Sequence, residues 1–325
     1  MREMSTARCY WFAGNLLGVV FTACLTVSNK DLLNRFGFLS GAGTLLFLHR
    51  SASFVFSRLT DTCGSSASSA KFAPRVPLSM LAVACVTSNV SIVLSFFVLR
   101  EASVAFHQVS RLLILPLSAA IDRILYGKRR TVLELSGICL IAYGSLIAVQ
   151  GDISTTRTAL MYAVLCAVAT VSSSSITGHI IKSTEIPARA VVYQLLPYEV
   201  LASFMLTIGL QYLQSDGALR KASWSFSSSS SSLSSTHALW ESLAQPLTSA
   251  LDRSLLPSLA FNLGCAISVV YLTVWAQGAS SNLFYAVIGQ AKMLSTVALG
   301  STVHHSYISR RTATGFAIAF VGTSL

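Results

Sequence analysis

The chain has 325 residues, of which 53% are hydrophobic and 11% are charged. A soluble domain carries about a quarter charged residues, so this composition excludes a water-exposed globular surface and indicates a protein that spans a membrane. The 23 lysines and arginines against 12 aspartates and glutamates give a net charge of +11, which in a membrane protein indicates loop orientation or an anionic cargo rather than nucleic acid.

Apolar runs long enough to cross a bilayer follow one another along the whole chain. A spanning helix needs about 20 mostly apolar residues, and the last run is short and reaches the final residue. The sequence predicts an all-α integral membrane protein with ten transmembrane helices. Their predicted ranges are 10–28, 37–57, 77–99, 103–121, 132–149, 158–181, 190–213, 254–275, 279–302 and 312–325.

The densest positive charge in a loop lies between the fourth and fifth predicted spans, at Arg123, Lys128, Arg129 and Arg130. Loops on the cytosolic side carry an excess of lysine and arginine. We therefore expect this loop to be cytosolic, and alternating crossings then place the amino terminus in the cytosol as well.

The loop after the seventh predicted span, residues 214–253, contains an uninterrupted serine tract at 227–232. Such low-complexity composition is typical of disorder. We expect this segment to be a disordered loop on the lumenal side.

Ten spans divide into two halves of five, residues 1–151 and 152–325. Transporters are often built from such repeats and bind their cargo where the repeats meet. Because each half has an odd number of spans, the second half would be inverted relative to the first. A basic residue lies deep in the fourth span of each half, Arg111 in the first and Lys292 in the second.

Arg111 is flanked by apolar residues on both sides, so burial of its charge in lipid would cost several kcal/mol. It must therefore face protein or water. Gln108 lies three residues earlier on the same helical face, and Pro116 is expected to open the helix just beyond.

Lys292 shares a helical face with Tyr285 and Gly289. The tyrosine ring and the space over the glycine could hold a base or sugar, with the lysine binding its phosphate. The alternative is structural: Arg111 and Lys292 would pair with buried acids such as Glu199, or Lys292 would reach an interface.

Further polar side chains are scattered through the predicted spans. Singly, each is more often a helix–helix contact than a ligand contact, but together they predict a hydrated, substrate-binding cavity. They include Lys30, His49, Asn89, Tyr193, Gln194 and Tyr198. No Walker loop, H-E-x-x-H or G-x-S-x-G motif occurs, so we expect no enzyme, no cofactor and no metal site.

The chain resembles the nucleotide-sugar and triose-phosphate transporters of the drug/metabolite transporter superfamily. Three departures from the family pattern are Arg111, where the family usually has lysine, His107 and Gln290. The resemblance rests on Ser28-Asn29-Lys30, Leu48-His49, Asn89-Val90-Ser91, the run Val104 to Leu112 with Pro116, the run Tyr193 to Tyr198, the run Tyr285 to Lys292, and the run Gly315 to Gly322.

This resemblance implies ten helices in two inverted repeats, with Arg111 and Lys292 holding the cargo phosphates. Tyr193, Gln194, Tyr198 and Tyr285 would then contact the base or sugar. It also implies alternating-access exchange of a nucleotide sugar, with a UDP-sugar favoured, for a nucleoside monophosphate across the Golgi or endoplasmic reticulum membrane. Whether the chain works as a homodimer stays open.

Two other functions remain open. A plastid-type exchanger of phosphorylated three- to six-carbon compounds for phosphate would use the same two cations, but it should carry a transit peptide, and only nine residues precede Tyr10. A non-transporting membrane scaffold or receptor would keep the helical bundle and use the loop 214–253 to bind a partner.

Overall fold

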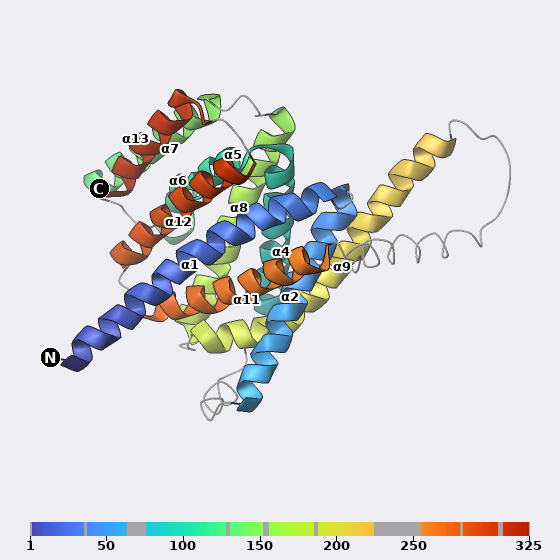
Figure 1. Ribbon diagram of the computed structural model, residues 1–325, viewed down its shortest axis with the longest axis horizontal. Coiled ribbons are helices and arrows are strands. Elements are labelled where there is room, and N and C mark those ends of the chain that lie inside the picture. The colour runs from blue at the N-terminus through green and yellow to red at the C-terminus, as the bar shows by residue number, and fades with distance from the viewer. Residues whose placement is uncertain are drawn as a thin grey trace.

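The computed structural model describes residues 2–35, 38–63, 76–127, 131–151, 156–184, 188–223, 255–279, 282–304 and 308–324. Within these ranges all regular structure is α-helical, and Figure 1 shows the helices gathered in one bundle. The helices are α1 (Arg2–Arg35), α2 (Phe38–Cys63), α4 (Leu78–Glu101), α5 (Val104–Leu112), α6 (Ile114–Tyr126), α7 (Val132–Gly151), α8 (Arg157–Thr184), α9 (Ala188–Ser223), α11 (Leu256–Ala279), α12 (Asn282–Val303) and α13 (Arg310–Ser324).

The helices coincide with the predicted spans to within a few residues at most of their ends. In the described part of the chain, four stretches are long and apolar enough to cross a membrane: Leu16–Asn34, Leu78–Glu101, Val104–Ile121 and Arg157–Thr177. Large apolar side chains such as Leu201 and Met205 lie exposed on the outside of the bundle, as expected for a surface that faces lipid. The protein is therefore an all-α, multi-pass membrane protein.

The fourth predicted span is divided into α5 and α6 at Leu113. Pro116 lacks an N–H and its ring would clash with the carbonyl of Leu112, four residues before it. At the division, the backbone N–H of Leu113 bonds to the carbonyl of Ser110, three residues before it, at 3.2 Å. This is a tighter turn than that of the α-helix. The prediction that Pro116 opens the helix is confirmed, and the opening at Leu113 lies two residues after Arg111.

Pairs of helices distant in sequence pack along their lengths: α7 with α13, α4 with α8, α2 with α9, and α1 with both α11 and α12. Figure 1 shows α7 and α13 side by side at the edge of the bundle. Their axes approach closely because small residues lie at the crossing. A Cβ atom added to Gly144 would come within 2.6 Å of the backbone N of Ala319, and one added to Gly315 would meet the backbone of Ala148.

One boundary differs from the sequence prediction. The segment 214–253 was expected to be disordered from its start, but α9 continues through it as far as Ser223. The stretch Gln211–Ser223 has few glycines and no proline, so the helix can propagate beyond the apolar part of the span. The serine tract at 227–232 lies outside the described residues.

Candidate functional site

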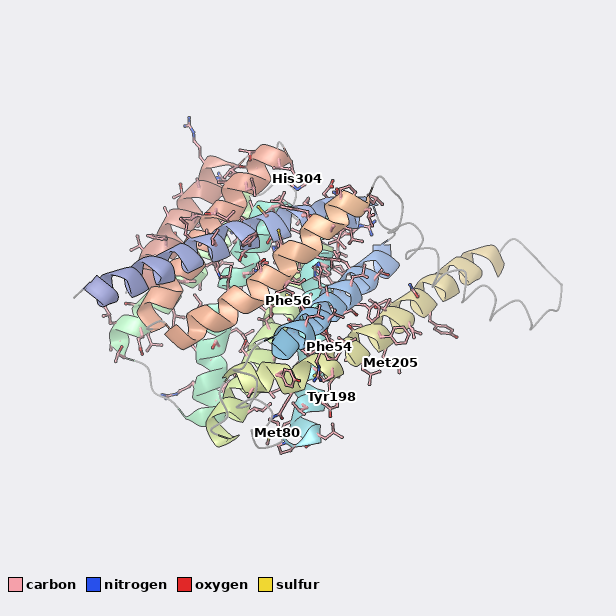
Figure 2. The ribbon with its side chains drawn as sticks, turned by 60° about the horizontal axis from the view of Figure 1, so that its bottom comes forward. Phe54, Phe56, Met80, Tyr198, Met205 and His304 are labelled. Carbon is pink, nitrogen blue, oxygen red and sulfur yellow. The ribbon has the colours of Figure 1, made fainter. Side chains whose placement is uncertain are left out.

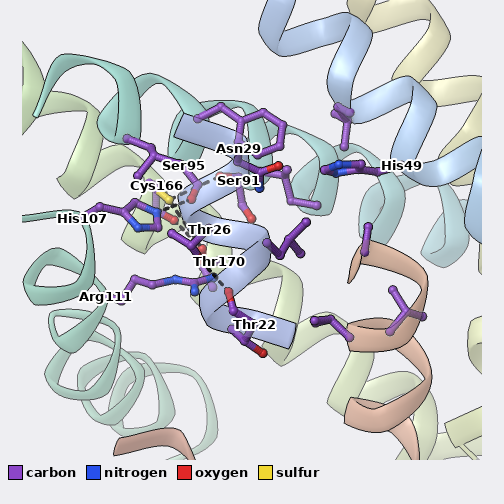
Figure 3. Close-up of a pocket in the computed structure, with 18 of the residues that line it drawn as sticks. Thr22, Thr26, Asn29, His49, Ser91, Ser95, His107, Arg111, Cys166 and Thr170 are labelled. Atoms are coloured by element: carbon purple, nitrogen blue, oxygen red, sulfur yellow. Dashed lines mark hydrogen bonds between the residues drawn. The ribbon is translucent and has the colours of Figure 1, made fainter. Parts of the chain in front are cut away.

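A cavity of about 290 Å³ lies within the bundle between α1, α2, α4, α5, α8 and α11. Its volume is near the lower end of the range of small-molecule sites. Figure 3 shows His107 and Arg111 on one side of α1 and His49 on the other. The polar residues of the lining are Thr22, Thr26, Asn29, His49, Arg50, Ser53, Ser91, Ser95, His107, Arg111, Cys166 and Thr170.

Arg111 is exposed at the wall of this cavity, on the last turn of α5. Among the residues that the structure describes, none forms an ion pair or hydrogen bond with its guanidinium. The described lining holds two arginines, two histidines and no carboxylate. A permanently charged guanidinium without a protein anion beside it is suited to bind a carboxylate or phosphate group of a ligand.

Lys292 lies beside α1 rather than in the lining itself. A Cβ atom added to Gly18 would be 3.9 Å from its Nζ atom, and Gly18 is one helical turn before Thr22, which does line the cavity. Arg111 is near enough for its charge to act on Lys292. The structure thus brings together the two cations that the sequence singled out, one from each half of the chain.

His49 belongs to a buried network that joins α2, α11 and α1. Its Nε2 atom is 2.6 Å from Oδ1 of Asn262. The Asn262 amide nitrogen donates to Oδ1 of Asn29 at 2.8 Å and to Oγ of Ser28 at 3.1 Å. Since that nitrogen donates, Oδ1 of Asn262 must accept, and His49 therefore carries its proton on Nε2. The network fixes the ring at the cavity wall.

Arg50, next to His49 in sequence, forms a buried ion pair with Glu199 of α9. The Arg50 Nη1 and Glu199 Oε2 atoms are 2.8 Å apart, and the side chains are 14% and 11% exposed. Ser88 of α4 accepts from Nη2 of Arg50 at 2.9 Å and donates to Oε1 of Glu199 at 3.1 Å. Glu199, the buried acid that could have paired with Arg111 or Lys292, is thus paired with Arg50.

His107 and Gln108 lie buried on α5 beside Arg111. The Nε2 atom of His107 is 2.7 Å from Oγ of Ser95 on α4. The predicted site residue Gln108 does not line the cavity; its amide nitrogen is 3.5 Å from Nδ1 of His107. The structure therefore places Gln108 behind His107, where it contacts the residue that faces the cavity.

Lys30, another predicted site residue, contacts the backbone at the end of α4. Its ammonium donates to the carbonyl oxygen of Leu99 at 3.0 Å and to that of Ala102. These carbonyls belong to the end of α4, where helical partners are missing. Lys30 thus ties α1 to the corner between α4 and α5, outside the described lining of the cavity.

The predicted residues on α9 do not line the cavity either. Tyr193 accepts a hydrogen bond from Arg58, whose guanidinium also lies 4.6 Å from the centre of the Tyr193 ring. Gln194 accepts from the backbone N–H of Val76 at 3.1 Å. Tyr198 is 40% exposed, and in Figure 2 it lies on the other side of the bundle from His304.

Asn89 is buried against α9, where its amide nitrogen donates to the backbone oxygen of Glu199 at 3.3 Å. It supports the helix that carries Glu199 and does not line the cavity. Tyr285 and Gly289 belong to α12, but their side-chain positions lie outside the described residues.

Several lining residues were not predicted from the sequence: Thr22, Thr26, Ser91, Ser95, Cys166 and Thr170. They occur as pairs four residues apart, on α1, α4 and α8. Residues at this spacing share one helical face. Repeated hydroxyl or thiol residues at four-residue spacing in apolar spans were the available signal.

A protein of known function is similar to this chain along most of its length. The chain is similar to a UDP-rhamnose/UDP-galactose transporter. This protein, UDP-rhamnose/UDP-galactose transporter 1 of Arabidopsis thaliana, is 24% identical over 311 residues, which cover 94% of the chain and 79% of the relative. The likeness supports, at a modest level, the resemblance to nucleotide-sugar transporters. No family model matches the chain.

The fold also has a counterpart among solved structures. A protein of known crystal structure aligns with 96% of this chain over 94% of its own, with a TM-score of 0.50 and 15% sequence identity. At this identity the likeness concerns the fold alone.

Proposed function

We propose that the protein is a carrier that exchanges a nucleotide sugar, with a UDP-sugar favoured, for a nucleoside monophosphate across a Golgi or endoplasmic reticulum membrane. The observation that carries the proposal is Arg111, exposed in a cavity whose described lining holds no acid. The similarity to a UDP-rhamnose/UDP-galactose transporter supports the choice of substrate class.

In this mechanism Arg111 and Lys292 bind the phosphate groups that both cargoes share. Arginine binds two phosphate oxygens at once, and lysine adds a second positive charge. The two cations repel one another, so binding of an anion between them relieves this repulsion. The hydroxyl groups of α1, α4 and α8 supply hydrogen bonds to the neutral part of the cargo.

Alternating access is the proposed mode of exchange, between two inverted five-helix repeats, residues 1–151 and 152–325. The helix packing supports it. In chain order, the counterparts in the two halves are α1 and α8, α2 and α9, α4 and α11, α5–α6 and α12, and α7 and α13. When each helix is replaced by its counterpart, the contact of α1 with α11 becomes that of α8 with α4. In the same way, the contact of α1 with α12 becomes that of α8 with α5 and α6, whereas α2 with α9 and α7 with α13 are unchanged. Such a two-fold pattern is expected of inverted repeats.

The orientation proposed from loop charge places Arg123 and the amino terminus in the cytosol. In this orientation the contacts of Lys30 with Leu99 and Ala102 lie toward the lumenal ends of α1 and α4.

Exchange by the purified protein in liposomes tests the proposal. Liposomes preloaded with UMP should take up UDP-galactose, and Arg111→Ala or Lys292→Ala should lower uptake at least tenfold, because loss of one charged hydrogen bond costs about 1.5–3 kcal/mol. Arg123→Ala, an exposed cation at the end of α6, should leave uptake unchanged.

Two outcomes would decide against the proposal. Normal uptake by both Arg111→Ala and Lys292→Ala would remove the two cations from the mechanism. Uptake of triose phosphate against inorganic phosphate, with none of UDP-galactose, would assign the protein to the exchange of phosphorylated sugars instead. A scaffold would show neither activity.

A further inference from the structure

The cavity contains two guanidinium groups in different electrostatic states. Arg50 and Arg111 both line it, but among the residues that the structure describes a carboxylate lies beside Arg50 alone, at 2.8 Å. Glu199, which supplies that carboxylate, is not itself part of the described lining. The wall therefore presents one compensated and one uncompensated arginine.

The compensation is built into three helices. Ser88 of α4 is hydrogen-bonded to both partners of the ion pair, and Asn89 donates to the backbone oxygen of Glu199. These contacts hold the carboxylate of α9 against the guanidinium of α2. In a site with little water the two charges interact strongly and cancel as seen from the cavity.

We propose that Glu199 determines which cargoes the carrier accepts, by cancelling the charge of Arg50 and so limiting the number of anionic groups that the cavity can neutralise. Glu199 is a positioning residue that acts through Arg50, without touching the cargo. The proposal rests on the proposed function, because it concerns selectivity at the same cavity.

The reason is electrostatic. Arg111, with Lys292 near it, can compensate about two negative charges of a cargo. A further phosphate group would bring an extra charge that Arg50 cannot compensate while it is paired with Glu199, and burial of an uncompensated charge is costly. Selection against surplus phosphate is the expected result.

Binding of UMP and UDP to the purified protein provides the test, because the two differ by one phosphate group. Glu199→Gln frees the charge of Arg50, so the affinity for UDP relative to UMP should rise by about tenfold, the effect of one additional charge contact. Arg50→Gln leaves Glu199 without its partner and should shift the ratio in the opposite direction.

Two further variants separate charge from structure. Glu199→Asp keeps the carboxylate and should keep the wild-type ratio. The double variant Arg50→Gln/Glu199→Gln has the same net charge as the wild type and should return the ratio to near its wild-type value. If the ion pair only joins helices, the variants would lower thermal stability and leave the UDP to UMP ratio unchanged.

The proposal is overturned if folded Glu199→Gln protein shows the wild-type ratio of UDP to UMP affinity. It is also overturned if the double variant keeps the shift of either single variant. If one single variant does not fold, the opposite shift in the other still decides the question. If the wild type binds neither nucleotide, the proposed function fails, and the same variants are compared with inorganic phosphate and pyrophosphate, for which the charge proposal predicts the same changes in ratio.

Discussion

Asn262 is fully buried and bonds to side chains of two other helices, so its effect should exceed that of an ordinary polar residue. Asn262→Leu leaves His49 and Asn29 without their partner in a buried place. Unpaired buried polar groups cost about 1–3 kcal/mol each. We expect a lower midpoint of thermal unfolding for the purified protein in detergent.

Ser268→Ala on the same helix is the matched control. The Ser268 hydroxyl donates only to the carbonyl of Gly264, one turn earlier in α11, among its described contacts. Its loss should change the midpoint little. Equal effects of the two substitutions would show that the network of Asn262 adds no stability.

The sequence could identify Arg111 because a charge between apolar residues is informative by itself. It could not assign Tyr193 or Gln194, because their partners Arg58 and Val76 lie more than 100 residues away in the chain. The pairing of Arg50 with Glu199 was hidden for the same reason. Residues whose role depends on a distant partner require the packed structure.

At the scale of helices, the crossing of α7 and α13 depends on small residues. Gly144→Val would force its side chain into the backbone of α13, since a Cβ atom there already comes within 2.6 Å of Ala319 N. Overpacking of this kind costs about 1–3 kcal/mol. The unfolding midpoint should fall accordingly.

Gly209→Val on α9 provides the comparison, because a Cβ atom at Gly209 would have no atom within 4 Å among the described contacts. This variant also replaces a glycine within a helix, but at a position where the new side chain has no close neighbour. A similar loss of stability in both variants would indicate a general cost of replacing glycine in a helix rather than a tight crossing.

The sequence located the helices well because hydrophobic length is a strong signal for a membrane span. It was less successful where polarity changed without a change of backbone structure. The end of α9 at Ser223 lies beyond the apolar run. An opening of the fourth span near Pro116 could be predicted because proline has a direct steric effect, and the structure has it at Leu113.

For the whole molecule, one close contact between α5 and α12 bears on the proposed exchange. A Cβ atom added to Gly300 of α12 would lie 2.7 Å from Cγ1 of Val104 at the start of α5. This close contact lies at the same end as Lys30 and Ala102. If the protein works by alternating access, the two helices must approach and separate here in each cycle.

Gly300→Ala should therefore prevent full closure of this end, and should lower exchange in liposomes several-fold while binding of UMP stays within about twofold. The double variant Gly300→Ala/Val104→Gly removes all the Val104 side-chain atoms that the new Cβ would meet, including the Val104 Cβ at 2.8 Å, and should restore exchange. Loss of binding together with exchange, or no rescue by the second substitution, would contradict this role.

The great length of α9 has a practical consequence. With 36 residues and a rise of 1.5 Å per residue it is about 54 Å long, whereas hydrocarbon is about 30 Å thick. Figure 1 shows its end projecting beyond the other helices. This projecting rod offers an epitope in water, away from the cavity. An antibody fragment bound to it would report which face of a vesicle it occupies, and would do so without blocking the passage of solute.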